Sequence, residues 1–124
     1  MFYSESFPKT PSAAAHAREL IARLSAELPS GQLDDARLLT SELVANAVEH
    51  GRDNSEVEVR VDLAPERLRV EVLDGGPGFE WAPRRADAGN ERGWGLHFTH
   101  TVSSRWAVER GERTCVWFEL DRGP

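Results

Sequence analysis

The sequence predicts an α+β fold, a two-layer sandwich in which a mixed, mostly antiparallel sheet carries its helices on one face. Apolar residues first recur at helical spacing over residues 13–48, and later alternate with charged residues in two pairs of short segments. Because the helical segments stand together before most of the strands, one antiparallel sheet with helices on one side is favoured. The 124 residues are enough for a single domain, residues 1–124.

The first part of the chain predicts one strand and two helices. Residues 2–7 alternate in the manner of a short strand, and the proline that follows ends it. A first helix is expected from residues 10–12 to Leu28, since apolar residues recur on one face over that stretch. A second helix is expected over residues 33–50, with Gly51 as its C-terminal stop.

The rest of the chain predicts two hairpins separated by a long loop. Valines and leucines alternate with charged residues over residues 57–61 and 68–72, which predicts a hairpin with one buried face. A closing hairpin is expected from residues 106–110 and 114–120. Residues 74–93, rich in glycine, proline and charge, predict a loop of the length that is usually functional, and a short helix is expected over about 94–103.

Composition excludes several classes of function. Fifteen Lys and Arg against 21 Asp and Glu give a net charge of −6, which disfavours nucleic acid as the main partner. No apolar run approaches the ~18–20 residues of a membrane helix, and the first residues do not resemble a signal peptide. The single Cys115 excludes an internal disulfide and a cysteine-based zinc cluster. The sequence therefore predicts a cytoplasmic protein that contacts no membrane.

Glu42 and Asn46 form the first group of candidate functional residues. They lie four positions apart in the second predicted helix and so share one face of it. A carboxylate beside an amide oxygen can serve as a base next to a metal ligand, because Mg²⁺ takes oxygen ligands and often few from protein. The alternative is a surface glutamate and an asparagine that is bonded to a neighbouring loop.

Two glycine-containing segments follow. Asp74 stands directly after a predicted strand and opens the run Asp-Gly-Gly-Pro-Gly, in which a carboxylate can accept a hydrogen bond from an exocyclic amine such as that of adenine. A plain glycine turn that begins at the aspartate is the alternative. Gly93 and Gly95 lie where the third predicted helix opens, and there exposed backbone N–H groups and the helix dipole favour an anion.

Taken in this order, the three segments resemble the nucleotide-binding signature of the Bergerat-fold ATPases, which are also called histidine-kinase-like ATPases. Residues 42–46 match the Glu-x-x-x-Asn box of that group, residues 74–78 match the Asp-x-Gly-x-Gly box, and residues 93–96 match the final glycine box. The short chain and its closing strand, residues 114–120, resemble in particular the anti-sigma-factor serine-kinase branch of the group. The resemblance extends over essentially the whole chain.

The resemblance implies a role for the side chains of four residues. Asn46 would coordinate the Mg²⁺ that bridges the phosphates of ATP, and Glu42 would act as general base toward water or a substrate hydroxyl. Asp74 would accept a hydrogen bond from the adenine amine, and the Thr114 hydroxyl would assist the adenine end of the pocket.

The resemblance also implies that backbone groups of the glycine-rich segments lie near the nucleotide. Residues 79–92 would form a lid over ATP, and among its three arginines Arg92 is favoured for the phosphates because it adjoins the last glycine box. The glycine boxes would contribute Gly76, Gly78, Gly93, Gly95 and Leu96.

The function implied by the resemblance is that of a regulatory ATP-binding protein. Such a protein would act as an anti-sigma factor, binding a sigma factor and phosphorylating a serine or threonine of a STAS-type anti-sigma-factor antagonist with MgATP. The alternative is a non-catalytic module of the same fold that binds ATP, ADP or nothing and acts through protein contacts. A homodimer formed through the sheet is compatible with either reading.

Overall fold

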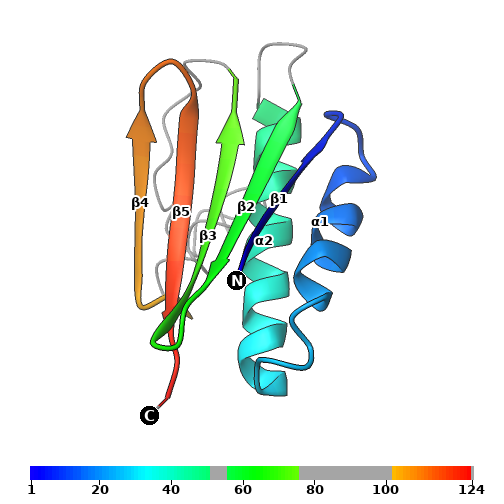
Figure 1. The fold of residues 1–124 in the computed structure, drawn as a ribbon. Coiled ribbons are helices and arrows are strands. Elements are labelled where there is room, and N and C mark those ends of the chain that lie inside the picture. The colour runs from blue at the N-terminus through cyan, green and yellow to red at the C-terminus, as the bar shows by residue number, and fades with distance from the viewer. Residues whose placement is uncertain (51–55, 76–101, 124) are drawn as a thin grey trace, which may run out of the picture.

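The computed structural model describes residues 1–50, 56–75 and 102–123 as a five-stranded sheet and two helices (Figure 1). The strand order is β1-β2-β3-β5-β4, and every neighbouring pair is antiparallel. Both helices lie on one side of the sheet, which confirms the predicted α+β two-layer sandwich. The elements are β1 (Phe2–Phe7), α1 (Ala13–Ala22), α2 (Ser30–His50), β2 (Val57–Leu63), β3 (Arg67–Asp74), β4 (Arg105–Arg110) and β5 (Thr114–Asp121).

The predicted extents of the two helices were wrong at the loop that connects them. Helix α1 ends at Ala22 and not at Leu28, because the backbone then forms tighter turns such as the one closed by the Leu24 N–H on the Ile21 carbonyl, 2.9 Å away. Leu28 is nevertheless buried, so the spacing of apolar residues correctly indicated which residues are buried even beyond the end of the helix. Helix α2 begins three residues earlier than expected, since the Pro29 carbonyl already accepts the Leu33 N–H at 2.9 Å.

The strand predictions are confirmed, with small extensions at their ends. In β2 buried and half-buried residues alternate without interruption, as the valine pattern required. Ala64 donates its N–H to the Arg67 carbonyl and closes the first hairpin, and Gly111 donates to Arg113 in the turn of the second. The predicted loop beyond residue 75 and all but the last two residues of the predicted helix over about 94–103 fall on residues 76–101, which lie outside the described part of the chain.

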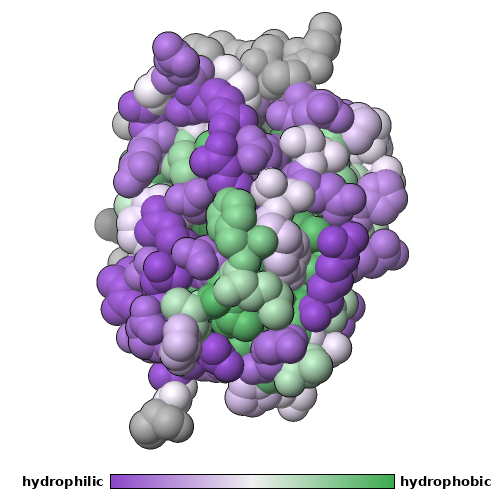
Figure 2. Space-filling view, in the orientation of Figure 1, coloured by the Kyte–Doolittle hydropathy of each residue, from purple (hydrophilic) through white to green (hydrophobic). Residues whose placement is uncertain are grey.

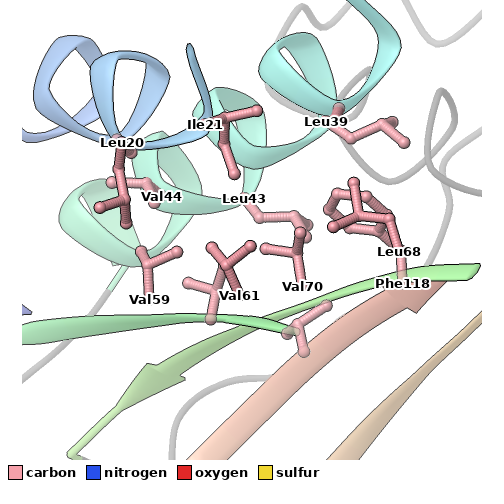
Figure 3. Packing of buried hydrophobic residues seen from close by; sticks show 14 of the residues in the cluster. Leu20, Ile21, Leu39, Leu43, Val44, Val59, Val61, Leu68, Val70 and Phe118 are labelled. Atoms are coloured by element: carbon pink, nitrogen blue, oxygen red, sulfur yellow. The ribbon is translucent and has the colours of Figure 1, made fainter. Parts of the chain in front are cut away.

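The hydrophobic core lies between the two layers. Side chains from α1 and α2 point toward the sheet and meet those of the central strands (Figure 3). Burying this much apolar surface is the main source of stability for a domain of this size. The labelled members of the cluster are Leu20, Ile21, Leu39, Leu43, Val44, Val59, Val61, Leu68, Val70 and Phe118.

The opposite face of the sheet is charged and faces solvent. Arg69 donates to the carboxylates of Glu71 and Glu119 and lies over the Trp117 ring, 4.1 Å from its centroid. Burial alone would raise the pKa of Glu119, but hydrogen bonds from Arg105 and Arg69 outweigh this and hold the pKa below its ordinary value. Trp117 therefore packs on the solvent-facing side of the sheet, beneath the Arg69 guanidinium.

A small apolar patch interrupts the polar surface where the chain begins (Figure 2). Met1 and Phe2 are 61% and 63% exposed at the start of β1, which is an edge strand. The N-terminal ammonium donates to the Leu63 carbonyl, 2.9 Å away, so this end of the chain is tied to the end of β2. Exposed apolar residues at a sheet edge favour association with another protein surface.

Thr40 of α2 provides a test of the core. Its side chain is fully buried, and its Oγ1 has no hydrogen-bond partner, so the hydroxyl has lost its water without compensation. Replacing Thr40 by Val keeps the shape and removes the polar atom, and we expect the protein to become more stable by about 1 kcal/mol. Urea unfolding measures this, with the exposed Thr10→Val as control. A loss of stability in Thr40→Val would contradict the prediction.

Candidate functional site

Four of the predicted site residues lie in the described part of the chain: Glu42, Asn46, Asp74 and Thr114. The other predicted site residues fall on residues 76–101, as does the predicted lid over residues 79–92, so their placement is not described. Their roles therefore stay predictions. These residues are Gly76, Gly78, Arg92, Gly93, Gly95 and Leu96.

The sheet brings Asp74 and Thr114 together. Asp74 is the last residue of β3 and Thr114 the first of β5, and the two are direct partners in the antiparallel register. Asp74 also continues the inward-facing series that includes Val70 and Val72, so its carboxylate lies on the face of the sheet that the helices cover. Both side chains are buried, and burial is unusual for a carboxylate such as that of Asp74.

Helix α2 brings Glu42 and Asn46 toward the same end of the molecule. The helix packs against β3, and its C-terminal end lies at the end of the fold where β3 finishes and β5 begins (Figure 1). Asn46 and Glu42 stand one turn apart, which follows from their spacing of four. The two pairs, one on the helix and one on the sheet, thus converge on one end of the sandwich.

The polar groups of this helix pair have no protein partner within the described ranges. Asn46 is only 8% exposed and Glu42 is half-buried, yet neither side chain makes a hydrogen bond or an ion pair to another described residue. Buried amides are nearly always hydrogen-bonded, so an open one calls for an explanation. An asparagine bonded to a neighbouring loop, the alternative that the sequence left open, is not found among these residues.

Lys9 is a member of the site that the sequence did not predict. Its ammonium forms an ion pair with Asp74 Oδ1, and the two side chains are only 8% and 5% exposed. Lys9 lies two residues beyond the end of β1, far from Asp74 in the sequence, and no motif marks it. The one available signal was that it is the only lysine in a chain whose other basic residues are arginines.

The chemistry of the described site is that of oxygen ligands and hydrogen-bond acceptors beside one cation. The part of the chain that the structure describes contains no group of three or more His, Cys, Asp or Glu that could hold a metal ion by protein ligands alone. Asn46 and Glu42 supply oxygens at the helix, and Asp74 supplies a buried carboxylate at the sheet. Such a site suits a polar ligand that brings its own charge and its own metal ligands.

Neither α1 nor α2 is long and apolar enough to cross a membrane.

Comparison with known proteins identifies the family. Residues 7–120 match the model of the histidine kinase-like ATPase domain. Over 92 residues the chain is 28% identical to the serine-protein kinase RsbW of Bacillus subtilis (strain 168), a match that covers 63% of this chain and 58% of that protein. The crystal structure of the RsbU and RsbW domains of Rv1364c from Mycobacterium tuberculosis has the same fold, with a TM-score of 0.74 at 23% identity over 97% of this chain and 31% of that one.

The family match extends from the last residue of β1 to the end of β5 and includes all four described site residues. The predicted resemblance to the Bergerat-fold group is confirmed by it. This chain is a member of the histidine kinase-like ATPase domain family.

Proposed function

We propose that this protein binds ATP and Mg²⁺ at the end of the sandwich where α2, β3 and β5 meet, and that it is an anti-sigma factor with serine/threonine kinase activity. Its protein substrate would be a STAS-type anti-sigma-factor antagonist, and a sigma factor would be its second partner. Membership of the ATPase family and the similarity to RsbW support this proposal. The apolar edge at Met1 and Phe2 supports a homodimer or another protein contact there.

The observation that carries the proposal is that α2 brings Asn46, which is 8% exposed, to the end of the sandwich at which the carboxylate of Asp74 is buried. The amide oxygen is a hard ligand of the kind that Mg²⁺ prefers, and Mg²⁺ is usually held by few protein groups together with substrate phosphates. The residues present therefore fit a magnesium–nucleotide complex. Bound there, Mg²⁺ would neutralise charge on the phosphates during transfer.

In the proposed reaction Glu42 accepts the proton of the substrate hydroxyl. As the hydroxyl oxygen of the substrate serine forms its bond to the γ-phosphorus, the bond from that phosphorus to the bridging oxygen breaks and ADP leaves. The hydroxyl proton must go to a base, and the half-buried carboxylate of Glu42 has no protein cation or donor paired with it among the described residues. It is therefore open to accept a proton from a substrate that docks beside Asn46.

Incubation with MgATP carrying a labelled γ-phosphate tests the proposal. The protein substrate is a STAS-type anti-sigma-factor antagonist, and the expected result is label on a serine or threonine of that antagonist. Nucleotide binding measured by calorimetry without label transfer would instead support the non-catalytic module. No affinity for ATP or ADP in the presence of Mg²⁺ would overturn the proposal altogether.

A further inference from the structure

The ion pair between Lys9 and Asp74 lies at the base-binding end of the proposed site, and its position follows from the register of the sheet. Phe7 pairs with Val57, Val57 pairs with Asp74, and Asp74 pairs with Thr114, so one row crosses four strands at this end. The chain leaves β1 after Phe7, so Pro8 and Lys9 follow directly from the first residue of this row. Lys9 can therefore reach Asp74 across β2.

The backbone around Lys9 is held in a tight turn. The Thr10 N–H donates to the Pro8 carbonyl at 2.8 Å, and the Ala13 N–H donates to the Thr10 carbonyl at 3.0 Å as α1 begins. The short connection between β1 and α1 thus fixes the point from which the Lys9 side chain extends. The Lys9 ammonium therefore reaches Asp74 from a backbone position that these hydrogen bonds fix.

Holding the fold together does not account for this pair. Strand β1 is already paired with β2 along its whole length, and the N-terminal ammonium is bonded to the Leu63 carbonyl. A buried ion pair is weak evidence for stability, because removing two charges from water offsets much of their attraction. An ammonium that is 8% exposed beside a carboxylate that is 5% exposed therefore calls for a further role.

We propose that Lys9 and Asp74 recognise the adenine base together, with Asp74 accepting from the exocyclic amine and Lys9 donating to the adjacent ring nitrogen N1. The inference rests on the proposed function, because it requires ATP in this site. The Lys9 ammonium is a hydrogen-bond donor and the Asp74 carboxylate beside it is an acceptor. On adenine, N1 is an acceptor and the neighbouring exocyclic amine is a donor, so the two pairs are complementary.

The same pair disfavours hypoxanthine and guanine. In these bases the group at C6 is a carbonyl and N1 carries a hydrogen, so in the pose that adenine adopts the acceptor would face Asp74 and the donor would face Lys9. Both contacts would then be mismatched in a buried site, where an unpaired polar group is costly. Lys9 thereby becomes a determinant of base selectivity.

Nucleotide analogues in which one ring nitrogen is replaced by C–H test the inference. Calorimetry measures the affinity of the wild type, Lys9→Met and Lys9→Arg for ATP, 1-deaza-ATP and 7-deaza-ATP, each with Mg²⁺. The wild type is expected to lose affinity for 1-deaza-ATP by about ten- to a hundredfold relative to ATP. Lys9→Met is expected to bind the two alike, and Lys9→Arg is expected to keep the preference because it keeps a cationic donor.

A role for Lys9 in structure alone would change all three affinities together and would overturn the inference, as would a wild type that binds ATP and 1-deaza-ATP equally. Tighter binding of ATP by Lys9→Met would also overturn it, since Lys9 would then compete with the base for Asp74. Lys9→Leu, which also lacks a donor, replaces Lys9→Met if that variant fails to fold. If the wild type binds neither ATP nor an analogue, the proposed function itself has failed.

Discussion

Replacing Glu42 by Gln is expected to lower the rate of phosphotransfer to the antagonist by roughly 10²–10⁴-fold, the range typical for removal of a general base. The amide has nearly the shape of the carboxylate but cannot accept the hydroxyl proton as the new bond to phosphorus forms. Affinity for MgATP should stay close to that of the wild type, because the metal ligand proposed on this helix is Asn46. Single-turnover transfer assays and calorimetry measure the two quantities separately.

Glu19→Gln is a matched control for Glu42→Gln. Glu19 is an exposed glutamate on the other helix, so the same chemical change there should leave both transfer and ATP binding unaltered. A Glu42→Gln protein that transfers phosphate at the wild-type rate would remove Glu42 from the mechanism. A parallel loss of ATP affinity would instead assign the carboxylate to binding.

Asp74→Asn is expected to remove most of the selection of adenine over guanine. A buried carboxylate can only accept hydrogen bonds, so it pairs with an amine and repels a carbonyl, whereas the asparagine amide can also donate. A site that satisfies its polar groups with the right base can reject the wrong one by ~10⁴-fold or more, and most of that ratio should be lost. The ratio of ATP to GTP affinity, measured by calorimetry with Mg²⁺, checks this.

The ratio of affinities is more informative than either affinity alone, because Asp74→Asn also leaves the buried Lys9 ammonium without its anionic partner. Some loss of stability is therefore expected and is followed by thermal unfolding. Asp62→Asn on β2 is the control, since that carboxylate pairs with Arg67 on the solvent face of the sheet. Comparable affinities for ATP and GTP in the wild type would show that Asp74 does not select the base.

Local patterns predicted the elements whose burial follows a simple period. The valines of β2 alternate with charged residues over the whole strand, so the sheet and its buried face could be predicted from the sequence. The end of α1 could not, because Leu24 and Leu28 keep a helical spacing while lying in turns. A helical spacing of buried residues normally marks a helix, but Leu24 and Leu28 are buried at that spacing in turns that follow the helix.

The site shows the same division between local and non-local information. Glu42 and Asn46 could be placed together because four residues make one helical turn. Asp74 and Thr114 could each be recognised in a segment of its own, but their pairing is a property of the β3–β5 register. Lys9 could not be found at all, since its contact depends on the pairing of β1 with β2 and of β2 with β3, which no short stretch of sequence encodes.

The row of partners that ends in Asp74 and Thr114 also bears on how the domain folds. Lys9 comes from near the beginning of the chain and Thr114 from near its end, so the proposed base-binding end assembles only after distant segments have met. Each hairpin pairs strands that are close in sequence, but neither contains all of the proposed ligand site. Capture of a fluorescent nucleotide during refolding would therefore follow completion of the domain and lag behind the appearance of secondary structure.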